Sequence, residues 1–288
     1  MSKTRTRRRK SPARTPEAAP ARPTPAAHPI RRSWLAIALA AATLVAYAPA
    51  IAAPFVFDDV PSIEKNVSIR RLWPASIPLQ PPKGDLAVSG RPVVNYTLAL
   101  NYAINAALDV DQRPDPDGPY KTVGYHFINI LLHLACGLVL FGLVARTIRH
   151  GRLDERWRPA ADWIAALVTG VWLLHPIQTE ALNYVVQRTE LLVSLCYLGT
   201  LYASSRTWDA PTKDAAWRWR AAAVIACVIG MGSKEVMITA PLAVVLYDRA
   251  FKVRSWRALV ERNGGQRWLY LMLATTSAVC IALIAAGP

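Results

Sequence analysis

Long apolar runs separated by short basic segments dominate the pattern of this chain. The first run, 34–53, has 20 residues and would be about 30 Å long as a helix, which matches the hydrocarbon core of a bilayer. Further runs of this kind occupy residues 124–145, 163–181, 189–205, 217–233, 236–247 and 268–286. The pattern predicts an all-α, polytopic membrane helical bundle of about seven transmembrane helices within residues 33–288.

Residues 92–110 are also apolar, but their polar positions follow a different pattern. Asn101 and Asn105 would share one face of a helix, with Thr97 close by. This amphipathic arrangement is typical of a helix that lies in the membrane interface. We therefore expect an interfacial helix within a long extracytoplasmic loop, 55–122, because a further span here would reverse the side of every later loop.

The charge of the loops predicts the orientation. Segments 146–160, 206–220 and 248–267 carry five, four and six basic residues, each against two acidic ones. Loop 55–122 has seven basic and eight acidic residues, so it lacks a positive excess. The positive-inside rule then places the N-terminus in the cytoplasm and the long loop outside. The chain is therefore expected to lie in a membrane with loop 55–122 on the extracytoplasmic side.

The first 32 residues hold ten basic residues and one acid, and they show no apolar periodicity. They are predicted to form a disordered cytoplasmic tail. A signal peptide is the alternative for a basic stretch before an apolar run, but the run that follows is longer than a signal-peptide core. We expect the tail to contact anionic membrane lipids or to set topology, in preference to binding nucleic acid.

The composition excludes two classes of soluble protein. With 53% apolar and 18% charged residues, the chain is more apolar and less charged than a soluble domain. The four cysteines lie inside apolar runs, where they cannot cross-link external loops, so a secreted disulfide scaffold is also excluded.

The fifth and sixth runs are unusually short. The stretch 221–232 has 12 residues, about 18 Å as a helix, and it ends at Ser233-Lys234-Glu235. Because charges that face lipid cost about 2.5–3.5 kcal/mol each, we expect a helical hairpin whose tip lies at a water-filled cavity open to the outside. The alternative is that Lys234 and Glu235 pair with each other at a turn in the interface.

Two adjacent carboxylates, Asp58 and Asp59, follow the first span directly. At this position a base would meet a lipid-borne electrophile on one side and a polar acceptor on the other. One carboxylate can take the proton of an attacking hydroxyl while its neighbour orients the acceptor or holds a metal. Taken alone, such a pair is more often a solvated turn.

A second polar cluster joins the third and fourth runs on the same outer side. It comprises His175, Glu180, Arg188 and Glu190. Glu180 and Arg188 pairing across the connection is the simpler interpretation. His126 and His133 lie seven residues apart in the second run, too far for joint metal binding, so interhelical hydrogen bonds are expected.

Three cations are candidate ligands for a phosphate group. Arg188 would bind it through a bidentate contact and Lys234 as a point charge. Arg91, in the long loop, is the third candidate, unless it is an ordinary surface arginine. No cofactor or metal motif is present in the sequence, and a divalent metal beside the aspartates is left open.

The order of these motifs along the chain resembles that of a known family. The motifs are Phe57-Asp58-Asp59, Gly90-Arg91-Pro92, Gly124-Tyr125-His126-x-x-Asn129, His175-Pro176-x-x-Thr179-Glu180-Ala181 with Arg188-x-Glu190, and Ser233-Lys234-Glu235. From about Phe55 to Asp248 the chain resembles the transmembrane-and-tetratricopeptide-repeat O-mannosyltransferases and their bacterial relatives, within the class C glycosyltransferases.

The resemblance implies a membrane glycosyltransferase with a class C core, and its bacterial relatives imply a bacterial inner membrane with the active site on the periplasmic side. Such an enzyme moves a sugar, here a mannose-like hexose, from a polyprenyl-phosphate or dolichyl-phosphate donor to a hydroxyl of an acceptor protein or glycan on the non-cytoplasmic face. Asp58 would be the general base and Asp59 its assistant, in an inverting displacement without a covalent sugar intermediate. Their positive charge and their expected place on the outer side of the membrane indicate that the ligands of the donor phosphate are Arg91, Arg188 and Lys234. The supporting polar residues would be His126, His175, Glu180, Glu190 and Glu235.

The chain departs from the family pattern, because no 34-residue repeat is present. We therefore expect a fragment or a minimal core. The rival function is a non-catalytic membrane protein, a transporter or assembly subunit, in which Lys234 and Glu235 line a pathway. A transferase should gather its ionisable groups at one outer cavity, whereas a transporter should place them near mid-membrane and show internal repeats.

Overall fold

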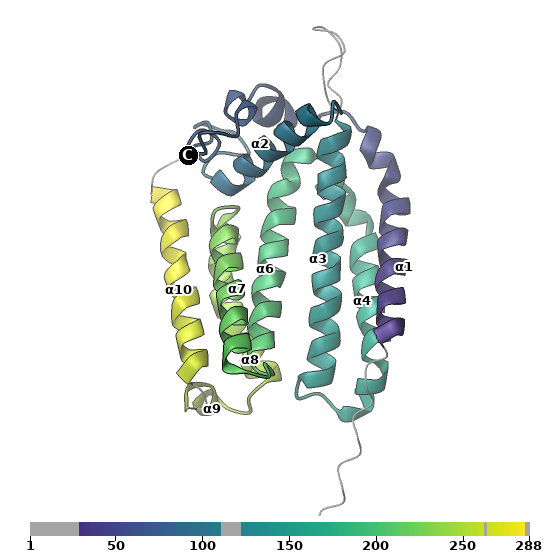
Figure 1. Ribbon diagram of the computed structural model, residues 1–288, viewed down its shortest axis with the longest axis vertical. Coiled ribbons are helices and arrows are strands. Elements are labelled where there is room, and N and C mark those ends of the chain that lie inside the picture. Colours follow the sequence, from purple (N-terminus) through teal and green to yellow (C-terminus); the bar gives the residue numbers. More distant parts are fainter. Residues whose placement is uncertain (1–28, 111–121, 262–263, 286–288) are drawn as a thin grey trace, which may run out of the picture.

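The computed structural model describes residues 29–110, 122–261 and 264–285, and within these ranges the protein is helical and contains no strand. This confirms the predicted all-α class. The long helices run along the long axis of the molecule (Figure 1) and are α1 (Pro29–Tyr47), α3 (Val123–His150), α4 (Ala161–Leu174), α6 (Arg188–Thr207), α7 (Lys213–Met231), α8 (Ala240–Phe251) and α10 (Gly264–Ala285). Helix α4 packs against α1 and α3, α6 against α3 and α7, and α10 against α7 and α8.

Three helical segments of the described chain are long and apolar enough to cross a membrane: Arg31–Ala52, Val123–His150 and Gly264–Ala285. The first joins α1 to the 3-10 helix η1 (Ala48–Ala52). A fourth is obtained if two segments that meet at 50°, Glu155–Leu174 and Pro176–Asn183, count as one span. Each of the seven expected segments contains a helix, but length and apolarity together identify only these three or four as candidate spans.

Two predicted boundaries differ from the limits of the helices in the structure. Helix α1 begins at Pro29, inside the stretch predicted to be disordered, because proline is well suited to the first position of a helix. Residues 1–28 of that predicted tail lie outside the described residues. The third expected span, 163–181, is interrupted, since α4 ends at Leu174 and His175 adopts an extended backbone before Pro176. The chain continues through η5 (Pro176–Gln178), α5 (Thr179–Asn183) and η6 (Val185–Gln187).

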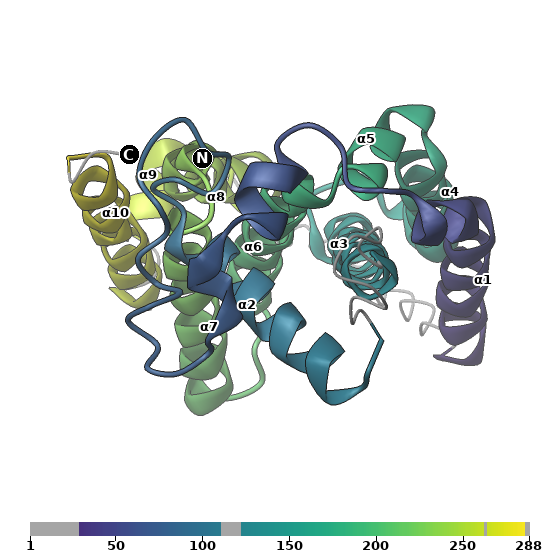
Figure 2. The same cartoon turned by 90° about the horizontal axis from the view of Figure 1, so that it is seen from above.

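Helix α2 (Pro92–Ala107) lies across one end of the bundle, together with the loop that precedes it (Figures 1 and 2). That loop contains η2 (Val60–Glu64) and η3 (Val67–Arg70). That α2 lies in the membrane interface stays a prediction. The backbone N–H of Val93 donates to the carbonyl of Gly232 at 3.1 Å, so α2 is attached to the tip of the α7–α8 hairpin.

The hairpin tip depends on two glycines. A Cβ at Gly232 would lie 2.7 Å from Val93 Cγ2, and one at Gly230 would lie 2.6 Å from Met237 Sδ. Only a residue without a side chain allows such close approach. After the tip, the chain forms η7 (Glu235–Thr239) and returns along α8.

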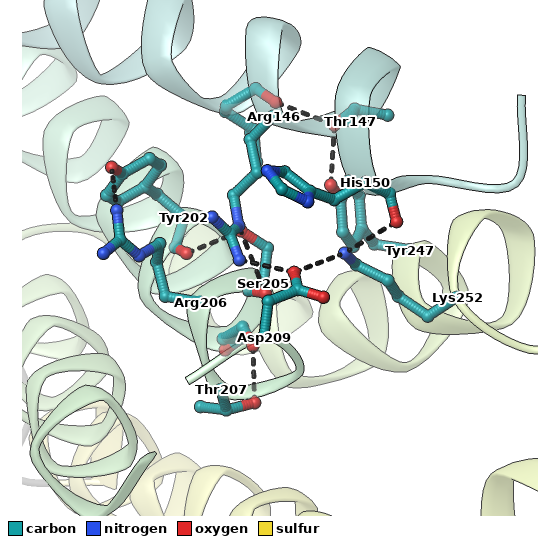
Figure 3. Close-up of polar contacts among 12 residues, drawn as sticks. Arg146, Thr147, His150, Tyr202, Ser205, Arg206, Thr207, Asp209, Tyr247 and Lys252 are labelled. Atoms are coloured by element: carbon teal, nitrogen blue, oxygen red, sulfur yellow. Dashed lines mark hydrogen bonds and ion pairs between the residues drawn. The ribbon is translucent and has the colours of Figure 1, made fainter. Parts of the chain in front are cut away.

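The opposite end of the bundle is held by ion pairs. Asp209, which follows α6, accepts hydrogen bonds from Arg146 of α3 and from Lys252 just after α8 (Figure 3). Buried Asp162 at the start of α4 pairs with Arg149 of α3 and, at 3.4 Å, with Arg31 of α1. Both groups join three segments at the end where α9 (Trp256–Glu261) also lies.

Helices α3 and α4 pack so closely at Gly137 that a larger residue there is expected to lower the stability of the protein. A Cβ at Gly137 would lie 2.6 Å from Leu173 Cδ2, and Leu173 is completely buried. Gly137→Ala should therefore destabilise the protein by about 1–3 kcal/mol, because a filled core resists added volume. The measurement is the midpoint of thermal unfolding of the purified protein in detergent.

Gly199→Ala in α6 is the matched control. Its Cβ would lie 3.8 Å from Ala226 Cβ, an ordinary contact, so the higher helix propensity of alanine should leave stability equal or slightly raised. Equal midpoints of thermal unfolding for Gly137→Ala and Gly199→Ala would contradict the close contact between α3 and α4.

Candidate functional site

Asp59 is completely buried and anchors the first loop to the start of α6. Its carboxylate accepts backbone N–H groups from Val56 at 3.2 Å, Val185 at 3.2 Å and Val186 at 2.7 Å. The last two begin η6, where a helix N-terminus favours a negative charge. Burial raises the pKa of Asp59, while the N–H donors and nearby His126 act in the opposite direction. Residues 127 positions apart in the sequence are thus joined by one side chain.

Asp58 is exposed, in contrast to its neighbour. Its backbone N–H donates to the hydroxyl of Tyr184 at 3.0 Å. Burial, and to a smaller extent a hydrogen bond to the side chain of Asp58, raise the pKa of Tyr184 to about 12. The hydroxyl of Tyr184 therefore holds the backbone of Asp58 in place.

Phe57 has a backbone conformation that side chains rarely adopt. Its φ is +46°, and its ring lies 6.3 Å from the ring of Tyr184 in an edge-on arrangement. Strained residues of this kind persist where the surroundings enforce them, often at functional sites. Sequence reasoning missed Tyr184, although it lies between the two polar motifs of the α4–α6 connection.

The guanidinium of Arg188 is completely buried at the first position of α6. It donates to the side-chain oxygens of Asn129 at 2.8 Å and Asn101 at 2.7 Å. It also donates to the carbonyls of Tyr125 at 3.1 Å and Thr97 at 3.3 Å. Arg188 thus binds α6 to α2 and α3, and its side chain is not open to a lipid ligand.

Glu180 does not pair with Arg188, contrary to the simpler interpretation of the sequence. It is exposed and accepts a hydrogen bond from Gln187 at 3.3 Å. His175 is also exposed, and its Nδ1 accepts the backbone N–H of Ile177 at 3.2 Å, which caps η5. Both residues therefore lie at the surface of the α4–α6 connection.

His126 is completely buried and links α3 to two other segments. Its Nδ1 lies 3.0 Å from the carbonyl of Leu182, and its Nε2 lies 3.0 Å from the carbonyl of Ala53. His133 Nε2 lies 3.0 Å from the carbonyl of Leu173 in α4. The expected hydrogen bonds between helices are present for both histidines.

Two ion pairs surround the tip of the α7–α8 hairpin. Lys234 pairs with Glu190 in the first turn of α6, and Arg91 lies 3.6 Å from Glu235. Lys234 and Glu235 thus pair with other segments and not with each other. Both are among the residues that line a cavity of about 300 Å³, which are Ser89, Gly90, Met231, Lys234, Glu235, Cys280, Leu283 and Ile284.

The structure brings together four of the predicted residues, namely Arg91, Glu190, Lys234 and Glu235. The residues that line the cavity do not include Asp58. The two parts are joined through the backbone, because Asp59 binds Val186 and Glu190 follows four residues later. No group of three His, Cys, Asp or Glu residues within the described ranges is arranged to hold a metal ion.

Comparison with known proteins identifies relatives by their amino-acid sequence. No protein-family profile matches the chain, and no solved structure matches it. Protein O-mannosyl-transferase Tmtc2 of Drosophila melanogaster is 30% identical over 214 residues, which are 71% of this chain and 20% of that protein. Protein O-mannosyl-transferase TMTC4 of Homo sapiens is 26% identical over 231 residues, 72% of this chain and 28% of that protein.

A third relative, protein O-mannosyl-transferase F38B6.6 of Caenorhabditis elegans, is 24% identical over 218 residues, 71% of this chain and 26% of that protein. The matched part of the chain therefore spans only 20–28% of the length of these relatives. These similarities place the chain in the TMTC O-mannosyltransferase family, the family that the order of its motifs predicted.

Proposed function

We propose that this chain forms the catalytic membrane part of a glycosyltransferase that moves mannose from a polyprenyl-phosphate donor to an acceptor hydroxyl. The names of its relatives support the reaction class. The observation that carries the proposal is the arrangement at the α2 end of the bundle. There an exposed carboxylate, Asp58, and a half-buried ammonium, Lys234, both flank the start of α6.

The two aspartates take different roles in this proposal. Asp58 is the general base, because its carboxylate is exposed and Tyr184 holds the backbone of this residue in place. Asp59 is a positioning residue, because its buried carboxylate is engaged by three backbone N–H groups and cannot reach an acceptor.

The donor binds at the cavity beside Lys234. Its apolar wall, formed by α7 and α10, suits an isoprenoid chain, and the ammonium suits the phosphate. Arg91 supplies a second cation beside Glu235. Arg188, the third phosphate ligand predicted from the sequence, is buried, so in this proposal it positions α6 and does not bind the donor. Glu190 and Glu235 neutralise the two cations before the donor arrives.

The reaction is a single displacement. Asp58 accepts the proton of the acceptor hydroxyl while the hydroxyl oxygen forms a bond to the anomeric carbon. The bond from that carbon to the phosphate oxygen breaks, and the lipid phosphate leaves with the electron pair. The ammonium of Lys234 stabilises the charge that develops on the phosphate. Attack from the face opposite the leaving group inverts the anomeric configuration.

The positive-inside rule supports an orientation for this enzyme. The three basic segments all lie at the end of the bundle away from α2, so α2 and the proposed site would face the extracytoplasmic side. In this arrangement α1, α3, α4, α6, α7, α8 and α10 all take part in the membrane bundle. His126, His175 and Glu180 support the loops around the site.

Asp58→Asn should reduce mannose transfer by about 100-fold or more, because the amide cannot accept the proton. Its thermal midpoint should stay unchanged, since the side chain is exposed. Asp59→Asn should lower both transfer and the thermal midpoint. The assay follows transfer from mannosyl-polyprenyl phosphate in proteoliposomes, and Asp85→Asn, an exposed carboxylate of the same loop, is the control. Full activity of Asp58→Asn would overturn the proposed base.

Lys234→Met should weaken binding of mannosyl-polyprenyl phosphate by about tenfold or more, because a charged hydrogen bond to the phosphate is lost. Glu190→Gln should leave binding equal or tighter, since it frees the ammonium. Lys65→Met, an exposed cation of the same loop, is the matched control. Binding is measured by titration in detergent. Equal weakening by Lys234→Met and Glu190→Gln would show that the ion pair is structural and that the phosphate binds elsewhere.

A further inference from the structure

A basic cavity of about 510 Å³ lies at the end of the bundle away from α2. It is bounded by the α3–α4 connection and by the segment between α8 and α9. Four of its lining residues are cationic and one is acidic: Arg152, Arg158, Lys252, Arg254 and Glu155. The proposed transferase does not use this cavity.

The backbone holds the two walls of the cavity together. Arg152 donates its N–H to the carbonyl of Phe251 at 2.9 Å, and its guanidinium donates to the carbonyl of Val253 at 2.7 Å. Segments about 100 residues apart are thereby fixed as one surface. The cations are therefore not simply scattered over separate flexible loops.

The side chain of Lys252 is part of the cavity wall. Its side chain is only 3% exposed, and Nζ lies 3.3 Å from Asp209 and 3.4 Å from the carbonyl of His150 (Figure 3). Asp209 also pairs with Arg146, so it is shared between two cations. The charge of Lys252 is consequently only partly balanced.

The arginines leave unused hydrogen-bond donors. Arg158 pairs with Glu155 at 3.0 Å, yet its buried Nε has no partner among the described residues. Arg152 and Arg254 have no carboxylate partner in the same part of the chain. A ligand with several anionic oxygens can satisfy these donors, and guanidinium groups match phosphate oxygens best.

We propose that this cavity binds a phosphate ester, supplied by the headgroup of an anionic phospholipid. The basic segments of the chain gather at this end, which would face the anionic leaflet of the membrane. A topology signal alone requires only charge near the membrane, whereas here two segments form a single cavity with a buried lysine in its wall.

The test compares two double variants of the protein in phosphatidylcholine nanodiscs with and without phosphatidylglycerol. Arg152→Gln with Arg254→Gln removes two cations of the cavity. Arg156→Gln with Arg218→Gln removes two exposed cations that do not line it. Phosphatidylglycerol that remains bound after detergent extraction is measured by mass spectrometry. It should fall by about tenfold or more in the first variant and stay nearly unchanged in the second.

Equal loss in both variants would overturn the proposal in favour of general surface charge. Binding of radiolabelled inorganic phosphate in phosphatidylcholine discs, sensitive to the same two arginines, would overturn the lipid source and indicate a soluble phosphate ligand. Arg254→Gln alone provides a second variant if the double variant fails to fold, because this exposed side chain makes no hydrogen bond within the described residues. A retained lipid signal in that single variant would contradict a contact between Arg254 and the headgroup.

Discussion

The buried carboxylate of Asp59 is the interaction on which the α2 end of the molecule depends. It connects the loop after α1 to the first residues of η6, and η6 leads directly into α6. A carboxylate without access to water is stable only if its oxygens receive hydrogen bonds, and here three backbone N–H groups supply them. The position of Asp58 on one side and of Glu190 on the other both follow from this anchor.

Arg188 complements this anchor with a buried positive charge. A cation at the first position of a helix is unfavourable for the helix dipole, so its placement must be explained by tertiary contacts. Asn101 and Asn129 supply two neutral acceptors from α2 and α3, and they hold these helices against α6. The face of α2 that carries Asn101 and Asn105 thus contacts protein, which explains why these asparagines are buried.

The two ends of the bundle use charge in different ways. At the α2 end, Lys234 and Glu190 form a half-buried ion pair beside a cavity with an apolar wall. At the other end, Asp162 and Asp209 each bind two cations and join three segments. The second arrangement joins several helices, while the first joins only the hairpin tip to the first turn of α6.

The sequence alone determined the helical segments, their approximate limits and the family, because apolar runs and the order of short motifs are local properties. It could not show that the neighbours Asp58 and Asp59 differ in burial, because they look alike in the chain. Only the tertiary structure distinguished them, by burying Asp59 under η6 and leaving Asp58 beside Tyr184. The same holds for Arg188, since burial depends on contacts with residues about 60 to 90 positions away in the sequence.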